Sequence, residues 1–349
     1  MNAPRSPRWL QGRAARALGI AACLVVLAVF PLVVADPTLM SIAVFTLIFI
    51  VAATAWNTFS GFSGYLALGH AAFFGTGGYA VALAARDWHF KGGWDVFALL
   101  PFGGLVAGLF AIPIGLVALR TRRHTFVVVT IAIFFIFQLA AFNLPLTGGT
   151  AGIQLPTPLW SADTFNRPFF WVTAVILVPT VVASWAIRRS RFGLQLLAIR
   201  DDEDRARGLG VQAGRVKLTA FVFSAIPVGM VGGMDVYFIG QIFLQFAFDP
   251  LFDISIALMA FLGGLGTLLG PLLGALVLES LQQYFTQTFS AGGTYLVVYG
   301  VLFLAVVLLL PRGVVPSVSQ ILSARRVRAS ERGRAASDAG VRNIAGTAP

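Results

Sequence analysis

Long uninterrupted runs of apolar residues recur along almost the whole of this 349-residue chain. Between charged or Gly- and Pro-rich breaks, the runs approach the length of about 20 residues that a helix needs to cross a bilayer. Only 11% of the residues are charged, whereas a soluble domain has about 25%. So few charges could not cover a soluble fold, and an outer-membrane barrel would alternate polar and apolar residues. The sequence therefore predicts an all-α polytopic membrane protein.

The apolar runs predict about ten transmembrane helices. Their expected ranges are 18–35, 39–59, 65–85, 96–119, 125–143, 169–187, 218–238, 251–267, 270–286 and 294–310. A Gly-rich break with Pro271 but no charge lies within 261–278, so this stretch is either a break or one helix. A secretory signal peptide over 1–35 is an alternative for the first span, since four arginines precede its apolar run.

The distribution of Lys and Arg predicts the orientation, because cytoplasmic loops carry an excess of positive charge. If the N-terminus is cytoplasmic, the cytoplasmic segments are 1–17, 120–124, 188–217 and 311–349. These segments contain 22 of the 25 lysines and arginines. Both termini are therefore expected inside. The net charge of +11 follows from this asymmetry, and no nucleic-acid partner is expected.

Three parts are expected along the chain. They are a basic cytoplasmic N-terminus at 1–17, a transmembrane domain at 18–310 and a disordered basic cytoplasmic tail at 311–349. A division after the fifth span leaves five spans in each half. Because five is odd, the halves would have opposite orientations, as in the inverted repeats of many transporters.

Residues 188–217 form the one long charged loop. A first short helix on the membrane surface is indicated by Phe192, Leu194, Leu196, Leu197 and Ile199. A second is expected after Asp201 or Asp202, either of which can cap it, with Gly208 or Gly210 at its end. Its acidic first turn and basic last turn complement the helix dipole. The pattern suits either a solvated helix pair or a docking element for a cytoplasmic partner.

The same loop carries a resemblance to a known family. The coupling-loop signature of the LivM-type permeases of branched-chain amino acid ABC transporters resembles AIRDDEDRARGLGVQAGRVKLTAFVFSA at 198–225. Four other segments agree in order, namely GFSGYLALGHAAFFGTGGYA at 61–80, LTGGTAGI at 146–153, the Gly-rich stretch 255–274 and YGVLFLAVVLLLPRG at 299–313. The resemblance covers most of residues 18–315.

This resemblance implies a permease subunit of an ATP-driven importer in the bacterial inner (cytoplasmic) membrane, with branched-chain amino acids as the expected substrate. The implied partners are a second, LivH-type permease, two ATPase subunits and a periplasmic substrate-binding protein. The implied coupling positions are Glu203, Arg205, Ala206, Arg207, Gly208 and Gly210. The family usually has a glutamate where this chain has Arg207, so the ATPase is expected to carry a compensating acid.

No cofactor is expected on this chain. A phosphate-binding loop needs a Gly-Lys pair, and the two lysines, Lys91 and Lys217, follow Phe and Val. ATP is therefore expected on separate subunits. The three histidines are widely separated and Cys23 is the only cysteine, so the sequence predicts neither a metal site nor a disulfide.

Candidate pathway or gating residues combine small residues, polar groups and one intramembrane acid. Small residues allow close helix packing, and interrupted helices can expose backbone groups to a pathway. A charge in hydrocarbon costs a few kcal/mol or more, so an intramembrane acid is a functional candidate. The candidates are Gly69, His70, Gly75, Thr147, Gly149, Thr150, Gly264, Gly266 and Glu279. Asp235 and Asp253 are expected nearer the outer ends of their spans, within reach of solvent.

Two other classes of function compete with the importer. An autonomous ion-coupled secondary transporter or channel for a small polar solute would place acids deep in several spans, facing one another. A membrane scaffold without transport activity would not need the Gly-broken helices. Packing or plain turns also remain possible roles for each pathway candidate.

Overall fold

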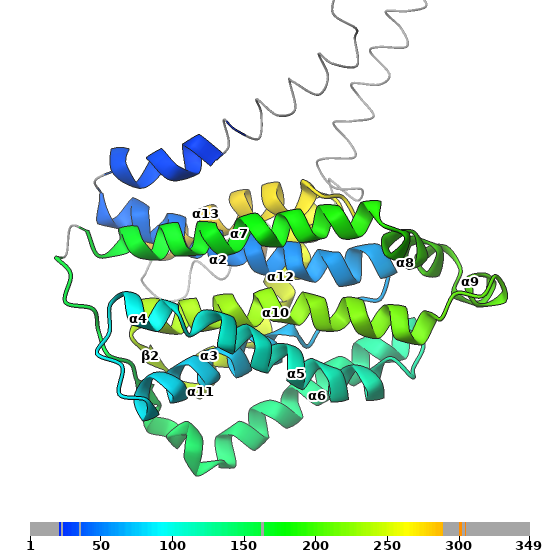
Figure 1. The fold of residues 1–349 in the computed structure, drawn as a ribbon, viewed down its shortest axis with the longest axis horizontal. Coiled ribbons are helices and arrows are strands. Elements are labelled where there is room, and N and C mark those ends of the chain that lie inside the picture. The colour runs from blue at the N-terminus through cyan, green and yellow to red at the C-terminus, as the bar shows by residue number, and fades with distance from the viewer. Residues whose placement is uncertain are drawn as a thin grey trace, which may run out of the picture.

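The computed structural model describes residues 21, 24–34, 36–161, 164–288, 300, 301 and 304. These ranges are almost entirely helical (Figure 1). The elements are α2 Pro37–Trp56, π-helical η1 Asn57–Gly61, α3 His70–Asp87, α4 Trp94–Phe97, α5 Leu100–Ala118, α6 Arg123–Asn143, the 3₁₀ turns η2 Pro145–Thr147 and η3 Gly149–Ala151, β1 Ile153–Gln154, α7 Asn166–Arg189, α8 Arg191–Asp201, α9 Glu203–Gly208, α10 Ala213–Ile239, β2 Gln241–Ile242, α11 Leu244–Ala247, α12 Pro250–Gly263 and α13 Gly270–Thr288. The predicted N-terminal segment 1–17, most of the tenth span and the tail 311–349 lie outside the described residues. Of the first span, 18–35, residues 21 and 24–34 are described, and they include the short apolar helix Leu24–Val33.

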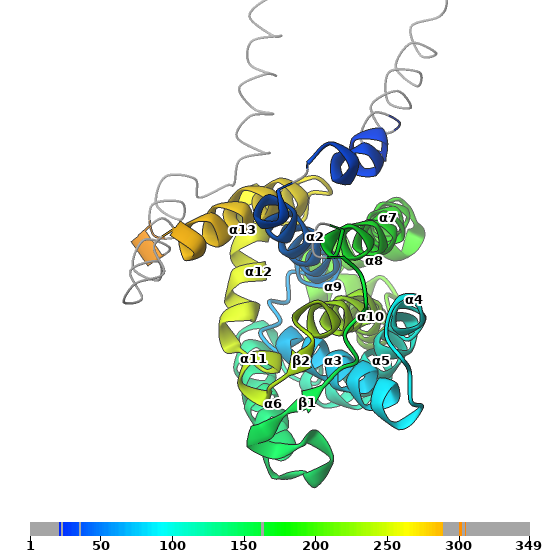
Figure 2. The same cartoon turned by 90° about the vertical axis from the view of Figure 1, so that its left-hand side faces the viewer.

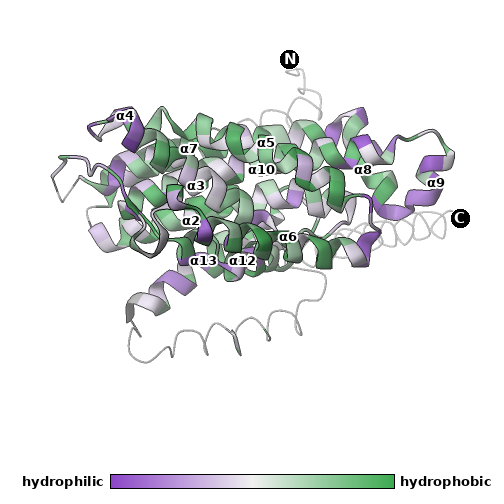
Figure 3. Cartoon of the chain, turned by 90° about the horizontal axis from the view of Figure 1, so that it is seen from below, coloured by the Kyte–Doolittle hydropathy of each residue, from purple (hydrophilic) through white to green (hydrophobic). Residues whose placement is uncertain are grey.

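The long helices α2, α7 and α10 run side by side (Figure 1). We call the end with α8 and α9 the loop end, and the end with α4 and β2 the far end. Hydrophilic residues gather at these two ends and hydrophobic residues fill the length between them (Figure 3). Six helical segments are long and apolar enough to cross a membrane: Pro37–Gly61, Trp94–Ala118, Arg123–Asn143, Asn166–Arg189, Ala213–Ile239 and Leu244–Gly263. The chain is a helical, multi-pass membrane protein.

Helix α10 occupies the centre, with its largest contacts to α3 and α5. Glycines allow these backbones to approach. A Cβ placed on Gly77 of α3 would lie 2.2 Å from the carbonyl oxygen of Gly229, and one on Gly232 would lie 2.1 Å from that of Phe74. Membrane helices associate through such small-residue contacts, because lipid provides no hydrophobic drive between them.

The expected third span, 65–85, begins later in the structure. Residues 64–69 are not helical, and α3 starts at His70. Side chains of the preceding turns hold this segment: Trp56 Nε1 donates to the carbonyl oxygen of Ala67 at 2.7 Å, and Ser60 Oγ accepts from its amide at 3.2 Å. Apolar composition alone could not reveal this interruption, because most residues on either side of the boundary are apolar.

Of the two alternatives for 261–278, a break or one helix, the structure shows the break. Helix α12 ends at Gly263 and α13 begins at Gly270. Gly264 and Gly266 have φ angles of 118° and 76°, which residues with a side chain rarely adopt. Figure 2 looks along the long helices and shows α12 from the side, running between α13 and α11. The expected eighth span, 251–267, is therefore a shorter helix that lies across the direction of its neighbours.

The close α3–α10 contact predicts that Gly232→Ala destabilises the fold. Its methyl group would meet the Phe74 backbone, and overpacking of this kind costs about 1–3 kcal/mol. Gly214→Ala in the same helix is the matched control, because nothing lies within 4 Å of its Cβ position. Thermal unfolding in detergent should show a lower Tm than the wild type for Gly232→Ala and no decrease for Gly214→Ala. Equal Tm values for the two variants would contradict the contact.

Candidate functional site: a loop helix tied to the membrane domain

The loop 188–217 contains two short helices, as predicted. Ser190 caps α8, its Oγ accepting from the Gly193 amide at 3.2 Å. Asp202, one of the two expected caps, begins α9 and accepts from the Arg205 amide at 3.0 Å. These caps satisfy amides that the first turn of a helix leaves without partners. Side chains of the loop itself therefore cap both of its helices.

Glu203 ties α9 to the membrane domain. Its Oε1 accepts from Lys217 Nζ of α10 at 2.8 Å and from Arg207 at 2.6 Å, and its Oε2 accepts from the Tyr65 hydroxyl. Lys217 also donates to the Tyr65 oxygen at 3.0 Å and lies 4.1 Å from the ring centroid. The carboxylate thus joins α9, α10 and the non-helical segment before α3.

This cluster is well shielded from water. The side chains of Lys217 and Glu203 are 1% and 15% exposed. Burial alone would raise the pKa of Glu203, but hydrogen bonds from Lys217 and Tyr65 and the nearby charges of Lys217 and Arg207 outweigh it and lower that pKa. Glu203 is therefore ionised and compensates the buried lysine.

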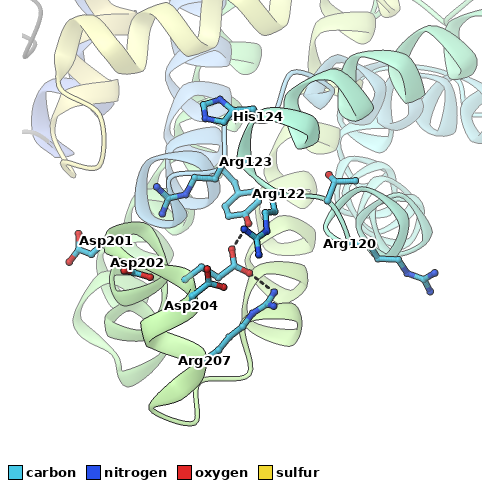
Figure 4. A pocket seen from close by; sticks show the side chains of 11 residues that line it. Arg120, Arg122, Arg123, His124, Asp201, Asp202, Asp204 and Arg207 are labelled. Atoms are coloured by element: carbon cyan, nitrogen blue, oxygen red, sulfur yellow. Dashed lines mark hydrogen bonds and ion pairs between the residues drawn. The ribbon is translucent and has the colours of Figure 1, made fainter.

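A polar cleft of about 390 Å³ opens beside this cluster (Figure 4). Residues 120–124, at the end of the α5–α6 loop and the start of α6, line one part of it, and Asp201 to Asp204 and Arg207 line another. Arg123 joins the two loops by donating to the carbonyl oxygens of Ile199, at 2.7 Å, and Arg200. Two segments distant in sequence thus form one charged surface at the loop end.

The six predicted coupling residues lie together on and after α9. Arg205 and Arg207 have side chains that are 86% and 56% exposed, and nothing lies within 4 Å of a Cβ on Gly208 or Gly210. Glu203 and the buried Ala206 instead face the membrane domain. The outward surface of α9 therefore carries charges of both signs, with Asp204 exposed beside the two arginines, and contains open glycines.

The predicted residues Gly69 and His70 lie at the buried start of α3. Asp253 of α12 accepts from the amides of His70, at 2.8 Å, and Ala71, at 3.2 Å. His70 Nε2 is 2.9 Å from Ser224 Oγ of α10. Asp253 is only 3% exposed, so the expectation that solvent reaches it is wrong. It was misplaced because α12 lies across the bundle, and its start is inside the protein.

The other pathway candidates lie in separate places. Gly75 packs on α11, where its Cβ would lie 2.6 Å from the Ala247 carbonyl oxygen. Thr147 is buried and donates to the carbonyl oxygens of Ala141 and Leu144, both at 2.7 Å. Gly149 and Thr150 follow in η3, where Gly149 is half-buried; the Thr150 side chain lies outside the described part of the chain. Their segment continues into β1, which pairs with β2 after α10.

Glu279 is fully buried on α13, as a deep acid should be, and accepts from Gln283 at 2.8 Å. Gly264 and Gly266 lie in the α12–α13 break. The structure thus does not gather the nine pathway candidates into one cavity.

Sequence reasoning also missed Tyr65 and Lys217 as partners of Glu203. The available signal was that Lys217 directly precedes an apolar run. Its partner Tyr65 could not be identified, because the two residues are 152 positions apart in sequence.

Breaking the buried pair should be costly. Glu203→Gln leaves Lys217 buried without a counter-charge, which costs about 3–5 kcal/mol, whereas Arg205→Gln, in an exposed pair, should cost about 0–1 kcal/mol. Chemical unfolding in detergent measures both. Adding Lys217→Met to Glu203→Gln should recover part of the loss. Equal effects of the two single variants would contradict the pairing.

The lowered pKa of Glu203 also predicts a pH dependence. A carboxyl whose pKa is lowered by folding stabilises the fold above its ordinary pKa, and this contribution is lost as the pH falls through the lowered value. The wild-type Tm should therefore fall more steeply than that of Glu203→Gln below about pH 4. Parallel curves for the two proteins would show that the carboxylate is not stabilised by folding.

Comparison with known proteins agrees with this arrangement. A family model described as "branched-chain amino acid transport system / permease component" matches residues 38–307. The chain is 29% identical over 293 residues to the high-affinity branched-chain amino acid transport system permease protein LivM of Escherichia coli (strain K12), and equally to LivM of Salmonella typhimurium. Each match covers 75% of this chain and 66% of the relative, which is just under two thirds of its length.

A more distant similarity points to the same kind of protein. The autoinducer 2 import system permease protein LsrC of Yersinia pseudotuberculosis is 26% identical over 197 residues, or 52% of this chain and 55% of LsrC. No solved structure matches the chain. The family match includes α2 to α13, and thus both the Glu203 cluster and the Gly-rich break. The chain belongs to the branched-chain amino acid transport system permease component family.

Proposed function

We propose that this chain is the transmembrane permease subunit of an ATP-driven importer for branched-chain amino acids. One observation carries the proposal: α9 presents an exposed charged face at the loop end, while the Glu203–Lys217 pair fixes its other side to α10. A helix held in this way can receive a force from a partner and pass it to the membrane helices. The names of the LivM relatives support the substrate class.

The proposed complex contains a second, LivH-type permease, two ATPase subunits and a periplasmic substrate-binding protein. ATP would bind to the ATPase subunits, since this sequence lacks the Gly-Lys pair of a phosphate-binding loop. The ATPase contact would use the four exposed members of the six coupling positions, Arg205, Arg207, Gly208 and Gly210, while Glu203 and Ala206 would hold α9 on the membrane domain. The permease would provide half of the translocation pathway, with the nine pathway candidates as residues to test.

The proposed location is the bacterial inner membrane, with ten spans and both termini in the cytoplasm. The described structure supports this orientation, because the Arg-rich segments 120–124 and 188–217 meet at the loop end. Two inverted five-helix halves belong to the same proposal. The ion-coupled alternative has less support, because the buried carboxylate of Asp253, among the described residues, already accepts from the amides at the start of α3.

The exposed face of α9 predicts an ATPase contact. Arg205→Glu and Leu209→Asp change side chains that point away from the membrane domain. In vesicles containing the full complex and an external binding protein, each should weaken ATPase binding about tenfold or more, since a buried contact pair is worth at least 1.4 kcal/mol. Arg86→Gln serves as the control, because Arg86 is an exposed residue in the last turn of α3 and is far from α9 in sequence.

Leucine uptake and ATPase co-purification measure this effect. Both should fall together in the α9 variants and stay unchanged in the control. Uptake that proceeds without the ATPase subunits and follows an ion gradient would contradict the importer and favour a secondary transporter.

A further inference from the structure

Three segments far apart in sequence meet behind the loop helices. They are the π-helical turn η1, the Gly-rich break 264–269 and the adjoining ends of α7 and α8. None of their cross-connections was expected from the sequence. The contacts among them bear on the proposed function, because α8 leads directly into α9, the proposed ATPase contact.

Asn57 joins the first two segments. Its Oδ1 accepts from the Gly266 amide at 2.8 Å and its Nδ2 donates to the Thr267 carbonyl oxygen at 2.9 Å. The side chain is buried within η1, and π-helical turns of this kind occur frequently at functional sites. The amide of Asn57 thus satisfies backbone groups that the break between α12 and α13 leaves open.

Two arginines add the third segment. Arg188, at the end of α7, donates to the Gly266 carbonyl oxygen at 2.5 Å. Arg200, at the end of α8, donates to the Gly61 carbonyl oxygen at 2.8 Å. Within the described chain neither has a carboxylate within 4.0 Å. Their charges instead face carbonyl oxygens, including one at the end of η1, where a helical segment carries partial negative charge.

The fit leaves little room for independent movement. A Cβ on Gly266 would lie 2.2 Å from Arg200 Nη1 and 2.8 Å from the Gly61 carbonyl oxygen. A Cβ on Gly61 would lie 2.9 Å from the Gly266 amide nitrogen. Packed contacts of this density transmit displacement, because they cannot be compressed.

We propose that Arg188 and Arg200 are positioning residues that transmit the movement of α8 and α9 to the α12–α13 break during transport. This inference rests on the proposed function and names the route by which the loop acts. A shift of α8 would pull on the Gly61 carbonyl through Arg200, and on the Gly266 carbonyl through Arg188 at the adjoining end of α7. We call the meeting point of these three segments the junction. Within it, the backbone of the break can change its dihedral angles most readily, because Gly264 and Gly266 have no side chain and already have positive φ angles.

The route continues beyond the break. Helix α12 begins with Asp253 in its first turn, and this carboxylate holds the start of α3. A displacement of α12 therefore reaches the His70 region without any contact between His70 and the loop. Coupling between sites requires such a contiguous set of packed and hydrogen-bonded groups with more than one arrangement.

The experiment compares Arg188→Gln and Arg200→Gln with Arg189→Gln in the full complex, reconstituted in vesicles with the binding protein and leucine. Arg189 is the matched control, because it neighbours Arg188 but stacks on Trp185, 4.5 Å from the ring centroid. The two junction variants should bind the ATPase and hydrolyse ATP at near wild-type rates. Leucine transported per ATP should fall about tenfold, the effect of one charge-assisted hydrogen bond, and the control should not change.

A second pair of variants separates transmission from mere folding. Arg188→Lys and Arg200→Lys keep a cation that can donate to the carbonyl oxygen and should recover most of the coupling. Hydrogen exchange of the break 264–269 should respond to ATP in the wild type and lose this response in the glutamine variants.

Each other outcome overturns the inference. Unchanged transport per ATP in both glutamine variants would show that the junction transmits nothing. Parallel loss of assembly, hydrolysis and transport, without recovery in the lysine variants, would show a structural role alone. A failure of the proposed function is distinguishable, because the wild-type complex itself would then show no ATP-dependent uptake.

Discussion

A backbone amide or carbonyl group inside a bilayer must find its partner within the protein, since the hydrocarbon offers none. Most of this chain meets the requirement by being helical. At η1, at 64–69 and at 264–269, however, the helical pattern is broken, and side chains take over. Trp56 and Ser60 bind the second of these segments, while Asn57 and Arg188 bind the third. The interruptions are thus stabilised by specific polar residues on neighbouring elements.

The second organising feature is the close packing around α10. Glycines on α3, α5 and α10 bring backbones together along the middle of the bundle, where a larger side chain would meet a carbonyl group or a neighbouring side chain. The same helix carries Lys217 near its start, at the loop end. A single helix therefore links the tightest apolar packing of the protein with the ionic cluster that anchors α9. This continuity gives the family's permease fold a direct physical connection between its loop and its core.

Sequence reasoning succeeded where the signal was local. Hydropathy identified most of the long helices, the Asp202 cap and the α9 charge pattern were legible within one turn, and Gly264 and Gly266 marked a real break. It failed where the answer depended on a distant segment. Asp253 was expected near solvent because nothing in its neighbourhood reveals that α12 crosses the bundle. Likewise, Tyr65 and Lys217 are 152 residues apart, and only the fold brings them to Glu203.

Lys217 has one more consequence, which concerns the order in which the protein assembles. An ammonium group at the start of a membrane helix stays hydrated until a counter-charge reaches it, because its transfer into the protein alone is strongly unfavourable. Its two partners come from different parts of the chain: Tyr65 is synthesised long before it, and Glu203 shortly before it. The start of α10 can therefore reach its buried position only after α3 and the segment before it are already in the membrane. The docked position of α9 therefore requires that the segment before α3 and the start of α10 have already come together in the folded subunit.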